Sequence, residues 1–178
     1  IGYDPNIPRD PKPRMIKQFQ RNKSPKKASD VIGCIKSILF SARDLKIIEG
    51  TPADRRRYID ATISQLNRDY IVALREYNKI LENRNSLLKQ INTGKQESTA
   101  LDIWDIQASK AAAIIITIRG NILDTLSKAT SVFFSELNPK NPADNKITLR
   151  YASSAKVDSN DSISSLESSL IDCFGQAR

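Results

Sequence analysis

The chain has 178 residues, with 28 Lys and Arg against 20 Asp and Glu, two Cys and no His, and a formal net charge of +8. Without His the commonest general base is missing, and two thiols are too few for a zinc site, so the composition argues against metal-dependent and acid–base catalysis. No apolar run reaches about 18 residues and no charged-then-apolar leader opens the chain, which argues against membrane insertion and secretion. We expect a cytoplasmic protein. The sequence begins with Ile1 and not with Met, and an apolar pattern runs to its last residues. We therefore also expect the chain to be a piece of a larger protein.

The positive charge is concentrated at one end of the sequence. Residues 1–57 hold 14 of the 28 basic residues but only 6 of the 20 acidic ones, and the remainder of the chain is balanced. A localised basic excess is typical of a nucleic-acid-binding surface, although it also occurs as solubilising charge. Charge alone leaves both interpretations open.

The N-terminal 50 residues read as irregular structure followed by short strands. Four prolines in residues 1–14 predict an irregular segment. Apolar runs over 15–20 and 35–40 each predict a strand, with a turn at 21–25 and one helical turn near Ser29. Four basic side chains surround the turn and are candidates for DNA contacts: Arg21, Lys23, Lys26 and Lys27.

The next segment begins with a strong helix start. Thr51 supplies a capping hydroxyl, Pro52 occupies the first helical position and Asp54 completes a capping box, which predicts a helix over 52–66. Asn67 can cap a second helix, in which apolar residues recur at three-four spacing to residue 91. Arg84 occupies one position of this repeat, and we expect it to have a structural role.

A longer helix follows the polar connection 92–100. Ten positions alternate three and four residues apart: Leu101, Trp104, Ala108, Ala111, Ile115, Ile118, Ile122, Thr125, Ala129 and Phe133. This is a coiled-coil seam, and two such helices joined by a short loop pair antiparallel. The second would be about 50 Å long, and residues 52–91 are long enough to cover it. We therefore predict a three-helix arm over residues 51–138.

Beyond the arm, residues 146–151 alternate with period two and predict a strand, followed by a Ser-rich linker and an amphipathic helix from Ile163. The predicted fold is mainly α: an antiparallel coiled-coil-like arm of three helices, with short β segments at both ends that belong to an α/β body. Cys34 and Cys173 each lie in an apolar pattern, so we expect buried free thiols.

Three consecutive arginines open the arm. Successive helical residues lie about 100° apart, so Arg55, Arg56 and Arg57 cannot all face one partner. Arg56 can pair with Asp60 one turn later, which gives both a structural role, while Arg55 and Arg57 remain candidates for phosphate contacts. A plain solvated face is the alternative. Asp102 and Asp105 are expected to complement a helix dipole. No glycine begins a Gly-x-x-x-x-Gly-Lys run, so nucleotide cannot be bound by that route.

Residues 38–60, ILFSARDLKIIEGTPADRRRYID, closely resemble the RecF family of bacterial DNA replication and repair ATPases. Further matches follow in the family's order: SQL at 64–66, Tyr70, Tyr77, NRNSLLK at 83–89 and LDIWD at 101–105. The family usually has Pro-Glu where this chain has Ala42-Arg43, and residues 1–14 match no part of it. The resemblance covers about residues 15–151 and is weak beyond them.

The resemblance implies a central part of an ABC-type ATPase related to the SMC proteins. By resemblance, residues 15–50 and 139–178 belong to the ATPase lobe and 51–138 form the helical arm domain. The Walker A, signature and Walker B motifs fall outside this chain, which implies no catalysis and no cofactor here. By the same resemblance, the parent would be a weak DNA-dependent ATPase that binds ATP and Mg²⁺. Three residues at the junction of lobe and arm are expected near the nucleotide of the parent: Phe40, Ser41 and Asp44.

The same resemblance implies the partners of the parent. It would dimerise around ATP, bind single-strand/double-strand DNA junctions, and act with the RecO and RecR proteins to load a recombinase during recombinational repair and the SOS response. The residues themselves also fit a rival, a helical scaffold that binds only proteins, because the charge beyond residue 57 is balanced. Salt dependence separates the two, since phosphate contacts weaken with salt and an apolar helix interface does not.

Overall fold

The computed structural model describes residues 18–137 and 147–178 and confirms the mainly helical fold class. The predictions for residues 1–17 and for Lys146 lie outside the described residues. The elements in chain order are β1 (Phe19–Arg21), β2 (Ser24–Lys26), α1 (Ala28–Val31), α2 (Lys46–Glu49), α3 (Pro52–Leu66), α4 (Arg68–Asn92), α5 (Asp102–Leu137) and α6 (Ile163–Gln176). Short 3-10 helices precede α2 and α5.

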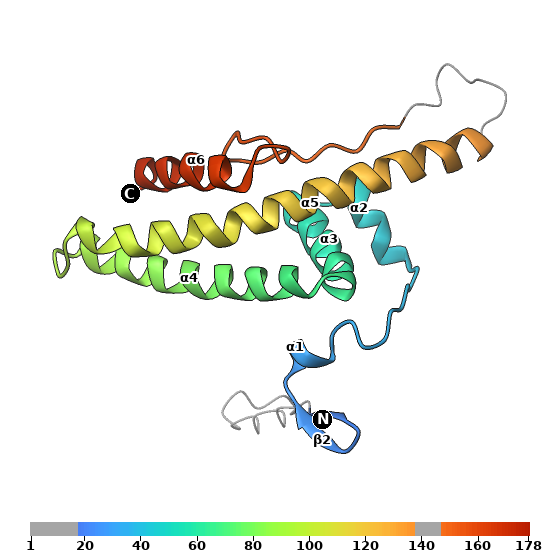
Figure 1. Ribbon diagram of the computed structural model, residues 1–178, viewed down its shortest axis with the longest axis horizontal. Coiled ribbons are helices and arrows are strands. Elements are labelled where there is room, and N and C mark those ends of the chain that lie inside the picture. The colour runs from blue at the N-terminus through green and yellow to red at the C-terminus, as the bar shows by residue number, and fades with distance from the viewer. Residues whose placement is uncertain (1–17, 138–146) are drawn as a thin grey trace, which may run out of the picture.

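The antiparallel pairing of α4 and α5 is confirmed (Figure 1). The loop between them contains Gly94 at φ 70°, a left-handed conformation that suits glycine. Gly94 N–H donates to Ile91 O at 2.8 Å and Lys95 N–H to Gln90 O at 2.9 Å, which satisfies the last carbonyls of α4. The chain is thereby turned back so that α5 returns along α4.

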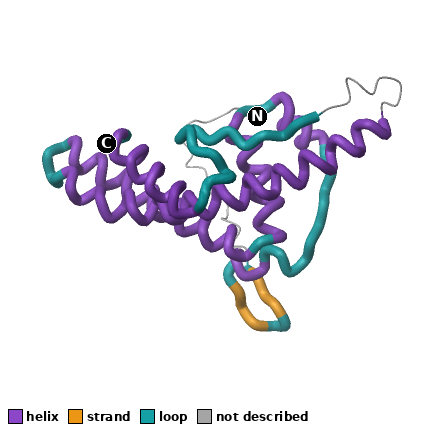
Figure 2. The backbone as a smooth tube through the Cα atoms, turned by 45° about the horizontal axis from the view of Figure 1, so that its top comes forward, coloured by secondary structure: helices purple, strands orange, loops and turns teal. Residues whose placement is uncertain are grey.

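Helix α5 is the central element, with α4 on one side and α6 on another (Figures 1 and 2). Two buried clusters form its contacts. Small residues of α5, Ala112 and Ala113, pack against Leu166 and Leu170 of α6. On the opposite side Ile115 packs with Ile63 of α3 and with residues of α4. The C-terminal helix, which the resemblance assigns to the lobe, therefore shares a core with the arm.

The seam of α5 is buried only over its first half. Leu101, Ala108, Ala111 and Ile115 are buried, whereas Phe133 is 64% exposed and Thr125 and Ala129 are also exposed. The expectation that residues 52–91 cover all of α5 is wrong, because α3 does not continue the line of α4. Asn67, at φ −131° and ψ 116°, ends α3 and caps α4, so the chain changes direction there and the far half of α5 projects (Figure 1).

The predicted strand over 35–40 is also wrong. This segment is an irregular, exposed loop, with Ile38 99% exposed. Of the strand predicted at 15–20, residues 18–20 are described, and β1 begins at Phe19. Asn22 and Lys23 both have positive φ, at 52° and 63°, which closes a two-residue hairpin turn. The chain therefore pairs with itself across residues 22–23, with Phe19 opposite Lys26.

Residues 147–151 do not form a strand in the structure, and lie extended along the second half of α5 (Figure 1). Two serines one turn apart on α5 hold this segment. Ser131 Oγ donates to Ile147 O at 2.6 Å, and Ser127 Oγ accepts from Leu149 N–H at 2.9 Å. The period-two pattern thus marks an extended segment whose backbone groups bond to side chains instead of a neighbouring strand.

The prediction of buried thiols is wrong for Cys34, which is exposed, and Cys173 is half-buried. The apolar residues around Cys34 lie in the same exposed loop region, with Ile35 80% exposed. An apolar sequence pattern buries a thiol only where another element packs on it. Cys173 does meet such an element, since its Sγ donates to Ala155 O at 3.6 Å.

Candidate nucleic-acid interface

The hairpin β1–β2 presents the four basic residues that the sequence singles out around its turn. Arg21, Lys23, Lys26 and Lys27 are all exposed. The tight turn places Lys23 at the tip, while the ladder pairs Arg21 with Ser24 at the ends of the strands. The structure thus brings four cations together on one small, protruding unit (Figure 2).

Of the three arginines at the start of α3, Arg55 has a structural role. The predicted capping box of Thr51 and Asp54 is present. Arg55 Nε donates to Ile47 O at 3.0 Å, and its Nη2 donates to Gly50 O at 3.1 Å, so the guanidinium caps the end of α2. Arg55 therefore has fewer donors left for phosphate than its exposed neighbours Arg56 and Arg57.

The predicted ion pair between Arg56 and Asp60 is wrong. Asp60 turns toward α5, where its Oδ1 accepts from Arg119 Nη2 at 2.6 Å and from Tyr70 Oη at 2.5 Å. Arg119 Nε also donates to Tyr70 Oη at 2.8 Å, and Nη1 donates to Tyr151 Oη at 3.4 Å. A mostly buried guanidinium outcompetes an exposed one, since a buried ion pair is screened less by water. Asp60 thus joins α3 to α4 and α5, and Arg119 extends the cluster to the returning segment through Tyr151.

Burial, followed by the hydrogen bond to Asp60, raises the pKa of the Tyr70 phenol well above its ordinary value. The phenol therefore keeps its proton, and its O–H donates a hydrogen bond to the Asp60 carboxylate. Burial also raises the pKa of Tyr77 on the same face of α4. Nothing in this cluster points to a proton-transfer role, because Asp60, Tyr70 and Arg119 are engaged with one another.

A second buried ion pair lies toward the tip of the arm. Arg84 Nε donates to Asp105 Oδ1 at 2.6 Å, with both side chains almost fully buried, and Arg84 Nη2 donates to Phe174 O at 2.9 Å. Arg178 Nη2 reaches the other oxygen of Asp105 at 2.8 Å. Asp105 thus binds two arginines rather than simply facing a helix dipole, and the cluster ties α4, α5 and α6 together.

The three residues expected near the nucleotide of a parent protein lie at the junction before α2. Phe40 is 87% exposed. Ser41 and Asp44 form the capping box of the 3-10 helix Ala42–Leu45, in which Ser41 N–H donates to Asp44 Oδ2 at 2.6 Å. The carboxylate of Asp44 is thus committed to holding the local turn, while Phe40 is free to contact another surface.

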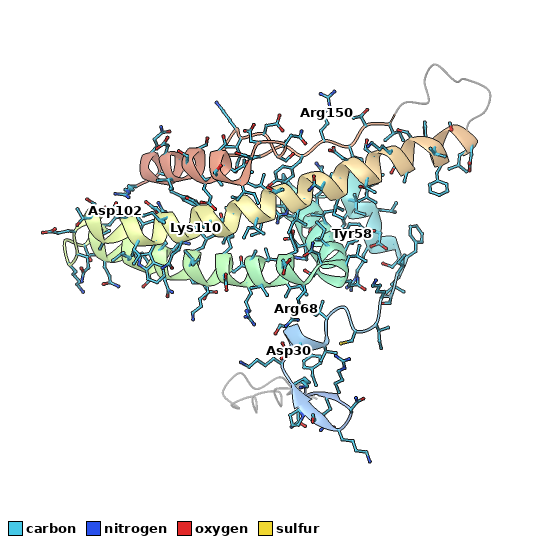
Figure 3. The ribbon with its side chains drawn as sticks, viewed as in Figure 1. Asp30, Tyr58, Arg68, Asp102, Lys110 and Arg150 are labelled. Carbon is cyan, nitrogen blue, oxygen red and sulfur yellow. The ribbon has the colours of Figure 1, made fainter. Side chains whose placement is uncertain are left out.

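Sequence reasoning missed Arg119 and Arg68. Arg119 directly follows the largely apolar run 111–118, and a charge at such a place is a usable signal of a buried ion pair. Arg68 Nη1 donates to Ser29 O at 2.7 Å, and its Nη2 pairs with Asp30 at 3.2 Å (Figure 3). No sequence spacing announces a contact across 38 or 39 residues.

Other classes of site find no support in the described part of the chain. Residues 18–137 and 147–178 contain no group of three His, Cys, Asp or Glu able to hold a metal ion. Over the same residues, no helix has the length and apolar content needed to cross a bilayer. The described elements define a helical arm attached to a protruding basic hairpin.

Comparison with known proteins finds several similar bacterial proteins. The DNA replication and repair protein RecF of Caldanaerobacter subterraneus subsp. tengcongensis is 36% identical over 132 residues, which are 74% of this chain and 35% of RecF. RecF of Lachnospira eligens is 40% identical over 114 residues, 63% of this chain and 31% of its own length. No protein-family model matches the chain.

The solved structures agree. The recombination mediator protein RecF of the RecFOR pathway, with ATP, superimposes with a TM-score of 0.81 at 30% identity, covering 90% of this chain and 42% of that one. RecF with ATPrS superimposes with a TM-score of 0.79 at 31% identity, covering 88% of this chain and 41% of that one. The chain spans about a third of the length of the curated relatives it matches. The chain therefore belongs to the RecF family.

Proposed function

We propose that this chain supplies the DNA-contacting flank and the lever arm of a RecF-like protein. In that proposal the whole protein binds ATP and Mg²⁺, dimerises around ATP, binds single-strand/double-strand DNA junctions, and acts with RecO and RecR to load a recombinase. Support comes from the sequence similarity to RecF and from the structural similarity to RecF with ATP or ATPrS in the RecFOR pathway. The observation that carries the DNA-binding part is the exposed basic hairpin β1–β2.

The arm is suited to act as a rigid lever. Helix α5 is continuous over 36 residues, and ion pairs join it to α4 at the tip and to α3 at the base. Packed helices move as rigid bodies, so a change at the base is carried to the tip. Arg57 and the hairpin lie at that base, where closure of a dimer would press them against DNA. Phe40, Ser41 and Asp44 lie at the same junction, which suits a position near the nucleotide of the whole protein.

The hairpin is tested by Lys26→Ala combined with Lys27→Ala in the full chain. Phosphate contacts fix position without reading sequence, so affinity for all DNA sequences falls alike. The slope of log K against log salt flattens by about one unit per lost contact. Lys110→Ala on the exposed face of α5 is the matched control. Unchanged affinity and slope in the double variant would leave the hairpin as solubilising charge.

A scaffold that binds only proteins is the second candidate, and one observation favours it. Several large apolar side chains are exposed on the far half of α5, including Val132, Phe133 and Leu137. An exposed apolar helix face is typical of a protein interface. Binding of a protein through this face would hardly respond to salt, which distinguishes it from phosphate contact.

A further inference from the structure

A cleft of about 610 Å³ lies between the N-terminal unit and the corner where α3 meets α4. One wall comes from the hairpin and residues 30–36, and the other from residues 64–68 of the arm. Three cationic side chains line it: Arg21, Lys36 and Arg68. Among the described residues of its lining Asp30 is the only acidic one, so these residues carry an excess of positive charge.

The two walls are tied together by specific contacts. Arg68 bonds to Ser29 O and to Asp30, which fixes α1 against the start of α4 (Figure 3). Ser37 N–H donates to Gln65 Oε1 at 3.1 Å. Gly33, at φ 83°, lies so close to α3 that a Cβ there would be 3.0 Å from Gln65 O. The cleft is thus a built joint with a defined shape.

Arg68 has donors to spare. A guanidinium carries five N–H groups in a planar fork, and the contacts to Ser29 and Asp30 use two of them. Its side chain is 56% exposed. The hydrogen bond from Arg68 lowers the pKa of Asp30, so the carboxylate stays ionised and holds the fork in place. An oriented arginine with free donors is well suited to bind phosphate.

We propose that this cleft binds a backbone phosphate of nucleic acid between Arg21, Lys36 and Arg68. This inference rests on the proposed DNA-binding function and adds the path of the DNA. A nucleic-acid strand that touches the hairpin lysines continues into the corner between α3 and α4. The beginning of the 25-residue helix α4 adds partial positive charge at the same place. The outer faces of α4 and α5 lie off this path.

Cys34 also lines the cleft and is exposed, so it can report what enters. In a Cys173→Ser chain, which keeps a donor toward Ala155 O, Cys34 is the only thiol. We expect its alkylation by N-ethylmaleimide to slow in proportion to the bound fraction when a junction DNA is added. An alkylation rate unchanged by saturating DNA would overturn the cleft as the binding path.

The second measurement is the affinity of Lys36→Ala for the same DNA at several salt concentrations. We expect a several-fold loss and a salt slope flatter by about one unit. Lys79→Ala, on an exposed part of α4 outside the cleft, is the matched control and should change neither quantity. Arg68→Gln should act like Lys36→Ala, but it also loosens the joint, so Lys36→Ala is decisive.

The outcomes separate this inference from the function on which it rests. Suppose that the hairpin lysine variants weaken DNA binding while Lys36→Ala and the alkylation of Cys34 show no effect. The proposed phosphate site in the cleft is then wrong, and the DNA-binding function stands. If the unaltered full chain binds no DNA, both are wrong. Protection of Cys34 together with a flatter slope for Lys36→Ala supports both.

Discussion

Arg119 shows how one side chain can organise the base of the arm. It lies in the most apolar stretch of α5 and is 8% exposed. Burying a charge is costly unless it is paired and hydrogen-bonded. Arg119 meets that condition through Asp60 and the hydroxyls of Tyr70 and Tyr151. The centroid of the Tyr70 ring also lies 6.0 Å from the guanidinium carbon. The residue therefore fixes how α3 crosses α5.

Arg119→Ala should lower the free energy of unfolding by about 3–5 kcal/mol, because it leaves the Asp60 carboxylate partly buried without its partner. Urea unfolding of the full chain measures this. Arg56→Ala is the matched control, and we expect little change because Asp60 bonds to Arg119 instead. Equal losses in the two variants would contradict the network.

At the scale of single helices, Ile115 tests the packing of α4 on α5. It is 3% exposed and packs in the cluster of Ile63, Tyr70 and Ala73. Ile115→Ala should cost about 2–5 kcal/mol in unfolding free energy, because it leaves a cavity among rigid neighbours. Val132→Ala, at a position 57% exposed on the same helix, should cost much less. A near-zero effect at Ile115 would show that the seam does not form.

Gly120 tests the crossing of the segment before α6 over α5. A Cβ at this position would lie 2.5 Å from both Cβ and Oγ of Ser159. Alanine favours a helix over glycine by about 1 kcal/mol, yet we expect Gly120→Ala to lower the melting temperature because the crossing segment must move. Adding Ser159→Gly should restore most of the loss. A stabilised single variant would mean that the segment does not rest on Gly120.

The elements differ in how far the sequence predicts them. The start of α3, the cap at Asn67 and the long α5 follow from local side-chain chemistry, and all three are present. The extent of burial along α5 does not follow, because it depends on the angle at which α3 leaves α4. The loop 35–40 has a strand's pattern but lacks a neighbouring strand in the described part of the chain.

The site residues divide in the same way. Clustering of basic residues around a predicted turn located the cations from sequence, since those residues are near neighbours, but the second strand of the hairpin, Ser24–Lys26, was not predicted. The roles of Arg55, Asp60 and Arg68 were misjudged or missed, because each bonds to a group that sequence distance does not reveal. Local charge patterns predict where cations gather, and only the fold decides which of them are already engaged.

At the scale of the whole molecule, we expect the chain to neither bind nor hydrolyse ATP by itself. The reason is chemical: no Gly-x-x-x-x-Gly-Lys run is present to cradle phosphates. Release of phosphate from ATP, followed through repeated purification of the full chain, measures this. Turnover that stays constant per mole of chain would contradict the expectation, whereas turnover that falls with purification reflects a contaminant.

The most direct test of the account is the affinity of the unaltered full chain for a single-strand/double-strand junction DNA across about 50 to 200 mM salt. The hairpin and the cleft together offer several phosphate contacts, so the account predicts that log K falls linearly with log salt with a slope of several units, whatever the DNA sequence. A flat slope, or the absence of DNA binding at the lowest salt, would contradict it and favour the protein-binding scaffold.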